Sequence, residues 1–220
     1  MVKILRVKPE KIKYTDLSRI HPDYTNKMDK AYNWMAKVYG AFMLVFPVWK
    51  KWIKNVIPHI KGNTILEISF GNGYLMSQYA SNQHEIYGID YNEKMVEVTR
   101  KKMKDKGLDI HLLKGNVEKL PFPDNSFDTI INTMAFTGYP DGNKALGEIN
   151  RVLKPGGRLL LVDFDYPKNR NVIGFAIVRL WEKFGDIIKD IDALLTEHNF
   201  EFEHTSVGGF GSVHLYIALK

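Results

Sequence analysis

The sequence predicts an α/β fold, in which a mostly parallel β-sheet is covered by helices on both faces. Three observations lead to this fold class. Strand-like and helical segments alternate after about residue 61, the first strand-like segment ends in a glycine-containing turn, and the chain has the size of one domain. At 220 residues and 45% hydrophobic content, the chain can bury one full-sized core and is too short for two large domains.

Short β-branched or leucine-rich runs are expected to form the strands. The first five are Thr64–Ser69, Glu85–Asp90, Asp109–Lys114, Thr129–Thr133 and Arg158–Phe164. Helices are expected between them over Gly73–Ser81, Glu93–Lys106 and Gly142–Leu153. This βαβ alternation predicts parallel strands, and ligands of such sheets bind beyond the carboxyl ends of the strands.

The C-terminal segment departs from this alternation. A helix expected over about Asp186–His198 is followed by two strand-like runs, Phe200–Val207 and Ser212–Leu219. The connection between these runs contains Gly208, Gly209 and Gly211 and is too short to hold a crossover helix. We therefore expect an antiparallel hairpin that completes a seven-stranded sheet.

An aromatic-rich block precedes the sheet. From Asp29 to Ile60, apolar residues recur at helical spacing, and Pro47 stands where one helix can stop and the next begin. We expect residues 1–60 to form an N-terminal helical cap and residues 61–220 to form the core.

Composition narrows the location and the chemistry. The absence of cysteine excludes disulfides, thiolate metal sites and cysteine nucleophiles, and it fits a reducing cytoplasm. The longest apolar stretch, Ala41–Trp49, is interrupted by Pro47 and is shorter than the ~20 residues that span a bilayer. The net charge of +6 is carried by lysine clusters on helix-like segments, where a solvated helix face is the favoured interpretation, so no nucleic-acid partner is expected.

The segment from Ile65 to Leu75 has the composition of a ligand-binding turn. Glu67 lies near the end of a strand, and Gly71 and Gly73 stand at the entrance to a helix, where backbone can approach a ligand closely. A dinucleotide is disfavoured because Met76 occupies the third small position and Glu67 would meet phosphate charge. Glu67 suits a ligand with an amino group and a sulfonium, although a tight turn without ligand remains the alternative.

Asp90 ends the second strand about 20 residues after the glycine turn, which is where a carboxylate accepts hydrogen bonds from both hydroxyls of a ribose. The alternative for Asp90 alone is a helix N-cap. Tyr91 and Met95 follow and are candidates to pack beside an adenine.

Two later segments carry a family resemblance. The chain contains LPFPDNSFD at Leu120–Asp128 and RVLKPGG at Arg151–Gly157, and with the motifs above it resembles the class I S-adenosylmethionine-dependent methyltransferases of the small-molecule, quinone and lipid branch (methyltransferase type 11-like). The resemblance extends over about Asn33 to Leu219. It implies a Rossmann-like sheet, S-adenosyl-L-methionine as cofactor and S-adenosyl-L-homocysteine as product.

The resemblance also implies where the cofactor lies. Glu67, Gly71 and Gly73 would line its methionine end, and Asp90 would hold the ribose. Asn116 and Val117 would meet the adenine edge, and Asn132 with Thr133 would lie beneath the methionine portion. Arg151–Gly157 would be a structural turn without ligand. The complete expected set is Tyr39, Glu67, Ser69, Gly71, Gly73, Asp90, Tyr91, Met95, Asn116, Val117, Asn132 and Thr133.

Three of these positions need comment. Ser69 stands where the family usually has glycine, and Asn116 stands where it usually has aspartate, so cofactor affinity is expected to be reduced but not lost. Tyr32 and Tyr39 match a pair of family tyrosines on a helix that closes over the cofactor. Two ordinary core tyrosines are the alternative for this pair.

Methyl transfer from a sulfonium is an in-line displacement and requires no obligatory catalytic side chain. Candidates for a base, if the acceptor must lose a proton, are Tyr139, Asp163, Asp165, Tyr166, His204 and His214. No metal is expected because the fourth strand ends in Asn132 rather than in an acidic residue.

The aromatic block favours a small, possibly lipophilic acceptor. Trp49 and Trp52 beside Lys50, Lys51 and Lys54 also predict a peripheral membrane contact. A methyltransferase of protein or RNA and a cofactor-binding fold without catalysis remain the alternatives.

Overall fold

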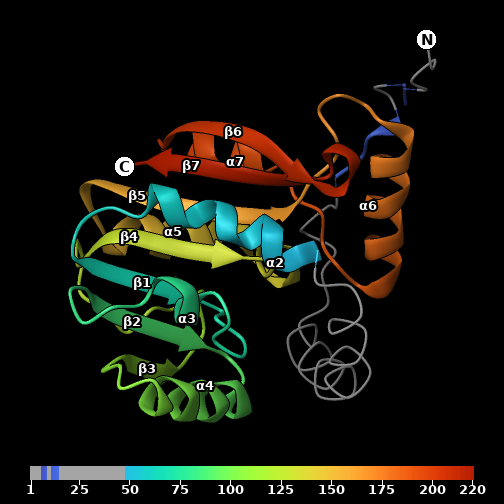
Figure 1. Ribbon diagram of the computed structural model, residues 1–220. Coiled ribbons are helices and arrows are strands. Elements are labelled where there is room, and N and C mark those ends of the chain that lie inside the picture. Colours follow the sequence, from blue (N-terminus) through green and yellow to red (C-terminus); the bar gives the residue numbers. More distant parts are fainter. Residues whose placement is uncertain (1–5, 9–10, 15–47) are drawn as a thin grey trace.

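The computed structural model describes residues 6–8, 11–14 and 48–220. Its centre is a seven-stranded sheet with the order β3-β2-β1-β4-β5-β7-β6 (Figure 1). The strands are β1 (Thr64–Ile68), β2 (Glu85–Asp90), β3 (His111–Lys114), β4 (Phe127–Thr133), β5 (Leu153–Phe164), β6 (Glu201–Gly208) and β7 (Val213–Leu219). The predicted α/β fold with a mostly parallel, seven-stranded sheet is confirmed.

Strand directions follow the prediction. β1 pairs in parallel with both β2 and β4, and the parallel arrangement continues from β2 to β3 and from β4 to β5. β7 runs antiparallel to both β5 and β6, which confirms the C-terminal hairpin. The carboxyl ends of β1, β2, β4 and β5 therefore share one edge of the sheet.

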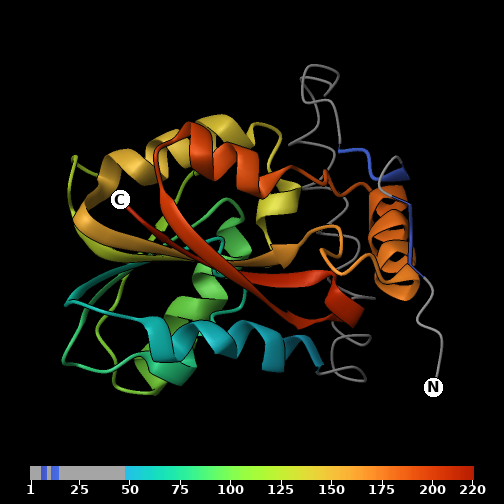
Figure 2. The ribbon, with the colours of Figure 1, turned by 90° about the horizontal axis from the view of Figure 1, so that it is seen from above.

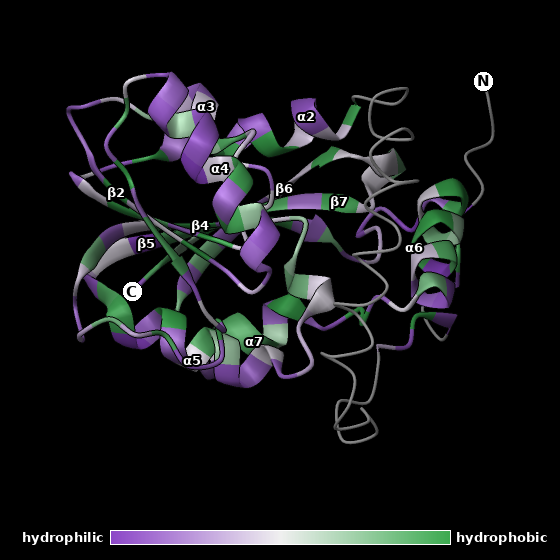
Figure 3. Cartoon of the chain, turned by 90° about the horizontal axis from the view of Figure 1, so that it is seen from below, coloured by the Kyte–Doolittle hydropathy of each residue, from purple (hydrophilic) through white to green (hydrophobic). Residues whose placement is uncertain are grey.

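Helices cover both faces of the sheet, as Figures 2 and 3 show. One face carries α5 (Gly142–Val152) and α7 (Ile191–Glu197), and the other carries α2 (Val48–Ile53), α3 (Met76–Tyr79) and α4 (Glu93–Asp105). Three short 3-10 turns complete these layers: η3 (Lys54–His59), η4 (Phe136–Gly138) and η5 (Gly209–Gly211). No helix within the described ranges is long and apolar enough to cross a membrane.

The core follows from the two-residue period of the central strands. On β5, Leu159 and Leu161 face the layer of α5 and pack in one apolar cluster with Ile149. Leu160 and Val162 alternate with them and pack on the opposite face with residues of α2 and η3. A strand buried on both faces must be apolar throughout, which explains the unbroken Leu159–Val162 run.

The sequence-based boundaries of three elements need correction. Helix α3 is only Met76–Tyr79 rather than Gly73–Ser81, because the residues before it form the turn, and α7 begins at Ile191, capped by Asp190, rather than at about Asp186.

β5 begins at Leu153 rather than at Arg158, so most of the segment expected to be a turn before the strand belongs to the strand itself. Gly156 has a left-handed φ of 76°. At Gly157 a Cβ would come within 2.8 Å of the Lys154 carbonyl oxygen. Gly156 and Gly157 are therefore needed because the backbone is irregular at the start of β5.

Helix α6 (Val172–Phe184) was not predicted from the sequence. Asn171 caps its start by accepting hydrogen bonds from the backbone N–H groups of Ile173 and Gly174. Gly185 ends the helix with a left-handed φ of 107°. These capping residues were the signal in the sequence that marked the two ends of the helix.

The predicted N-terminal helical cap falls mostly outside the described residues, as do Tyr32 and Tyr39. Its described end, α2 and η3, covers the sheet. The Trp52 ring packs edge-on against Phe164, with 6.4 Å between the ring centroids. It also fills the space beside Gly208, where a Cβ would come within 2.0 Å of the indole nitrogen. The division of the chain at residue 60 stays a prediction.

Candidate functional site

Three polar side chains near the ends of neighbouring strands define the candidate site. Glu67 comes from β1, Asp90 from β2 and Asn132 from β4, and all three are buried. In the register of the sheet, Ile68 of β1 is paired with Ile89 on one side and with Asn132 on the other. Because these strands are parallel, the sequence-predicted positions lie at one edge of the sheet.

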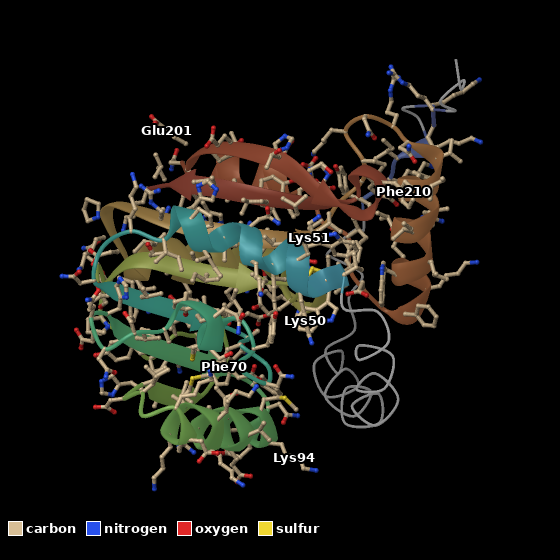
Figure 4. The ribbon with its side chains drawn as sticks, in the orientation of Figure 1. Lys50, Lys51, Phe70, Lys94, Glu201 and Phe210 are labelled. Atoms are coloured by element: carbon tan, nitrogen blue, oxygen red, sulfur yellow. The ribbon has the colours of Figure 1, made fainter. Side chains whose placement is uncertain are left out.

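The turn after β1 begins at Ser69 and includes Phe70, which is labelled in Figure 4. Ser69, Gly71 and Gly73 all have left-handed φ values, of 55°, 54° and 64°. A Cβ on Gly71 would meet nothing within 4 Å, whereas a Cβ on Gly73 would lie 2.4 Å from Cγ2 of Thr99. Gly71 therefore faces open space that a ligand can approach, and Gly73 is required by the packing of the turn on α4.

The Asp90 carboxylate is held by backbone donors from two turns. Its Oδ2 accepts a hydrogen bond from the Gly71 N–H at 2.8 Å, and its Oδ1 accepts one from the Asn92 N–H at 2.9 Å. The N-cap of α4 is Asn92, whose Oδ1 accepts from the N–H groups of Lys94 and Met95. The alternative interpretation of Asp90 as a helix cap is thus wrong, and its carboxylate is fixed beside the glycine turn.

Glu67 is a buried carboxyl group with few partners. Its Oε2 accepts a hydrogen bond from the Tyr79 hydroxyl at 2.9 Å. The pKa of Glu67 is raised to about 8, chiefly by burial; the Tyr79 hydrogen bond lowers it in part, and the nearby negative charge of Asp90 contributes to raising it. A positively charged group placed beside Glu67 would favour its ionised form.

Asn132 lies beneath this site and is fully buried. Its Nδ2 donates a hydrogen bond to the hydroxyl of Tyr139, and the same hydroxyl lies 2.8 Å from Oγ of Ser69. The Oδ1 of Asn132 has no hydrogen-bond partner. A buried acceptor without a donor is costly, so this oxygen is suited to a ligand that brings an N–H group.

Tyr139 was considered from the sequence as a base and not as a neighbour of the glycine turn. The signal that could have placed it was Ser69, because a serine in place of the usual glycine brings a hydroxyl that needs a partner. Burial raises the pKa of the Tyr139 phenol above its ordinary value. The phenol is therefore protonated at neutral pH and acts as a hydrogen-bonding group between Ser69 and Asn132.

The expected adenine-side residues flank the edge between β2 and β3. Tyr91 is 41% exposed, and Met95 is half-buried on the first turn of α4. Val117 is buried, while Asn116 is exposed and its Oδ1 accepts a hydrogen bond from the Glu118 N–H at 2.9 Å. The Asn116 side chain therefore shapes its own turn, a role that the sequence did not reveal.

Arg151 holds the loop that carries Asn116. Its guanidinium donates to the carbonyl oxygens of Leu120 and Phe122, at 3.0 and 2.8 Å. It also forms ion pairs at 2.8 Å with Glu148 and with Asp124. The two segments that carried the family resemblance are thus one structural unit, in which a planar side chain fixes a loop beside the site.

The other candidate bases lie away from Glu67 and Asp90 in the sheet order. Asp163 is fully buried near the end of β5, where it accepts hydrogen bonds from the N–H groups of Phe164 and Thr137. Asp165 accepts from the Tyr216 hydroxyl at 2.7 Å and pairs with Lys168 at 3.0 Å. The Tyr166 hydroxyl lies against Glu182, and His204 and His214 lie on the hairpin. None of these groups is brought next to the glycine turn.

The residues present fit S-adenosylmethionine. Glu67 and the Oδ1 of Asn132 are buried acceptors for an amino group, Asp90 is a fixed acceptor for hydroxyls, and Gly71 leaves room for close approach. Thr133, next to Asn132, is partly exposed at the same edge. Among the residues that the structure describes, no cluster of three or more His, Asp or Glu side chains could hold a metal ion.

Comparison with known proteins agrees with this geometry. A family model described as a methyltransferase domain matches residues 66–161. The ubiquinone/menaquinone biosynthesis C-methyltransferase UbiE of Shewanella baltica is 34% identical over 154 residues, which is 66% of this chain and 61% of the relative. The match thus spans less than two thirds of the relative's length.

Solved structures show the same fold. A methyltransferase of Thermotoga maritima, described as a possible histamine N-methyltransferase, has a TM-score of 0.69 at 20% identity and covers 86% of this chain and 98% of its own. The [4+2]-cyclase SpnF has a TM-score of 0.66 at 17% identity and covers 76% of this chain and 79% of its own. Residues 66–161 of the chain therefore match a methyltransferase domain, and the chain has the fold of S-adenosylmethionine-dependent methyltransferases, the class that its motifs resemble.

Proposed function

We propose that this chain transfers a methyl group from S-adenosylmethionine to a small, lipophilic acceptor by direct in-line displacement. The observation that carries the proposal is that Glu67, Asp90 and Asn132, three buried acceptor groups, lie near the ends of neighbouring strands at the edge of the sheet where the turn at Gly71 leaves open space. These groups match the amino group and the ribose hydroxyls of the cofactor. The bound cofactor supplies an electrophilic methyl group on its sulfonium.

The roles of the site residues follow from their contacts. Glu67 and Asn132 would accept hydrogen bonds from the amino group, and Asp90 would accept them from the ribose. Gly73 and Ser69 would shape the turn, with Thr133 beside Asn132. The adenine would lie against Tyr91, Met95, Asn116 and Val117, and Tyr39 would close over the cofactor from the proposed N-terminal cap at residues 1–60.

The chemistry requires alignment rather than a base. An in-line displacement is accelerated by holding donor and acceptor in a reactive geometry and by excluding water. The buried hydrogen bonds between Tyr139, Ser69 and Asn132 fix the floor of the site. Tyr139 thereby acts as a positioning residue, and the chain supplies a preorganised surface against which the acceptor can approach.

The acceptor class rests on the sequence relatives. A relative that is 34% identical is named a ubiquinone/menaquinone C-methyltransferase, and this name supports a quinone-like molecule for the present chain. A lipophilic acceptor resides in membranes. We therefore also propose a cytoplasmic protein that contacts a membrane peripherally. Trp49 and Trp52 do not provide this contact, because both are packed against the core.

Transfer of label from methyl-labelled cofactor tests this function. Purified chain is incubated with lipid extract, total RNA or protein lysate, and the labelled product is separated by solvent partition. Label in the lipid fraction is the expected result. Label confined to RNA or protein would overturn the acceptor class, and bound cofactor without any transfer would identify a cofactor-binding fold without catalysis.

A further inference from the structure

Helix α6 exposes an apolar stripe to solvent. Ile173, Leu180 and Phe184 are 53%, 53% and 64% exposed, and their spacing of seven and four residues places them on one side of the helix. The opposite side is used for packing, where Gly174 and Val178 are buried. Apolar side chains aligned in this way indicate a binding surface rather than scattered surface residues.

Phe210 lies close to the start of this stripe. It belongs to η5, between β6 and β7, and is 60% exposed with a left-handed φ of 55°. The backbone of η5 packs closely on α6, since a Cβ on Gly174 would come within 2.6 Å of the Phe210 carbonyl oxygen. Figure 4 shows Phe210 where the hairpin meets α6. We call Ile173, Leu180, Phe184 and Phe210 the α6 face.

The surroundings of the α6 face are basic. Arg179 and Lys183 are exposed on α6, and the one acidic residue of the helix, Glu182, is half-buried and paired with Arg179 at 2.7 Å. The described residues 6–8 lie beside the start of α6, where Arg6 bridges to Asn171 and the Val7 N–H donates to the Arg170 carbonyl oxygen at 2.8 Å (Figure 1). The exposed basic side chains of the described N-terminal residues are Arg6, Lys8, Lys11 and Lys13.

The apolar α6 face and the basic residues around it together indicate which kind of partner binds there. A second copy of the chain, docked through the same face by two-fold symmetry, would bring two surfaces that both carry basic residues together, which is unfavourable. An anionic lipid surface complements the charge, and its interfacial region accepts exposed Ile, Leu and Phe side chains. The helix also lies beyond the carboxyl ends of β4 and β5, at the edge where the candidate site is located (Figure 1).

We propose that the α6 face docks on the surface of an anionic membrane. This assignment deepens the membrane contact of the proposed function, to which it gives a surface. In this orientation α6 lies in the plane of the headgroups, with its apolar stripe inserted and its basic residues near the lipid phosphates. An acceptor dissolved in the bilayer would then reach the site edge without crossing bulk water.

Vesicle flotation tests the docking surface without requiring methyl transfer. The full chain is mixed with phosphatidylcholine vesicles, with and without phosphatidylserine, and the floating fraction is measured. The wild type should float with the anionic vesicles. The double variant Leu180→Glu/Phe184→Glu should lower the partition coefficient at least about 10-fold. Lys183→Ala should lower it about fivefold, and only with phosphatidylserine present.

A matched control separates this surface from general hydrophobicity. Val98 on α4 and Leu113 on β3 are 46% and 40% exposed, away from α6 at the other end of the sheet. Val98→Glu/Leu113→Glu makes the same change in charge and should float like wild type. Equal loss in the control, or unchanged flotation of the α6 variant, would overturn the proposal.

Two further measurements complete the test. Light scattering reports the oligomeric state, and a dimer that the α6 substitutions dissociate would identify the face as an interface between copies, which would also overturn the proposal. Cofactor binding by calorimetry is measured on the same variants. Normal cofactor binding with no flotation would reject the docking surface alone, whereas flotation without cofactor binding would reject the proposed function alone.

Discussion

At the scale of single residues, buried acceptors define the site. Asp90 is oriented by two backbone N–H groups, Glu67 has a single hydroxyl donor, and Asn132 keeps one oxygen without a partner. Their places near the ends of parallel strands pointed to Glu67 and Asp90 as site residues, and the family resemblance added Asn132. The sequence missed Tyr139 as their neighbour, because that contact joins residues 70 positions apart and depends on how the chain turns after β4.

Asp90→Ala should weaken cofactor binding by roughly 1 to 3 kcal/mol, since a charged acceptor of two hydroxyls is lost. Titration calorimetry measures the affinity, and circular dichroism reports the fold. Asn92→Ala is the matched control, because it removes the N-cap of α4 without removing the carboxylate. Unchanged affinity in a folded Asp90→Ala variant would contradict the ribose assignment.

Glu67 should make cofactor affinity depend on pH. Its pKa in the free protein is about 8, so at neutral pH it carries a proton that must leave before it can pair with an amino group. Affinity should therefore rise with pH and level off above about 8. Glu67→Gln should bind more weakly and lose this rise, as calorimetry across the range would report. If cofactor affinity still rose with pH in Glu67→Gln, the pH dependence would come from a titrating group other than Glu67.

At the scale of elements, the sequence predicted the strands and helices whose pattern is local. The alternation from Thr64 to Val152 predicted β1 to β4, α4 and α5 close to their observed bounds, and it predicted α3 at its place but too long. The sequence-based prediction failed where contacts with residues distant in the sequence determine the conformation. α6 is stabilised by its capping residues and by contacts with η5. The KPGG segment is part of β5 because this strand pairs with β4 and because the segment forms backbone hydrogen bonds with the C-terminal end of the chain.

Alanine substitutions at the two glycines of the turn should differ in effect, since Gly73→Ala should mainly lower stability and Gly71→Ala should mainly lower cofactor affinity. Gly73→Ala should destabilise the fold by roughly 2 to 4 kcal/mol, because the new Cβ would meet Thr99 and the backbone is left-handed. Gly71→Ala should cost only about 1 to 2 kcal/mol of stability but should weaken cofactor binding at least about 10-fold. Urea unfolding and calorimetry measure the two effects, and equal affinities in both folded variants would contradict the assignment of Gly71 to the ligand.

At the scale of the whole molecule, the parallel sheet brings the site residues together and the hairpin supports α6. A likeness of fold does not fix a reaction, since a cyclase and a methyltransferase both resemble this chain. The sequence motifs predicted the cofactor better than the acceptor. Cofactor contacts come from short motifs, whereas acceptor contacts depend on how α6 and the N-terminal residues are placed.

Calorimetry of the full chain with S-adenosylhomocysteine and with NAD tests the central claim most directly. Buried Glu67 favours an amino group over the phosphates of a dinucleotide, and Met76 fills the position where a dinucleotide turn needs a third small residue, whereas Asp90 would accept from ribose hydroxyls in either ligand. We predict saturable binding of S-adenosylhomocysteine that Asp90→Ala weakens, and no heat above dilution for NAD. Tight binding of NAD with no response to S-adenosylhomocysteine would contradict the account.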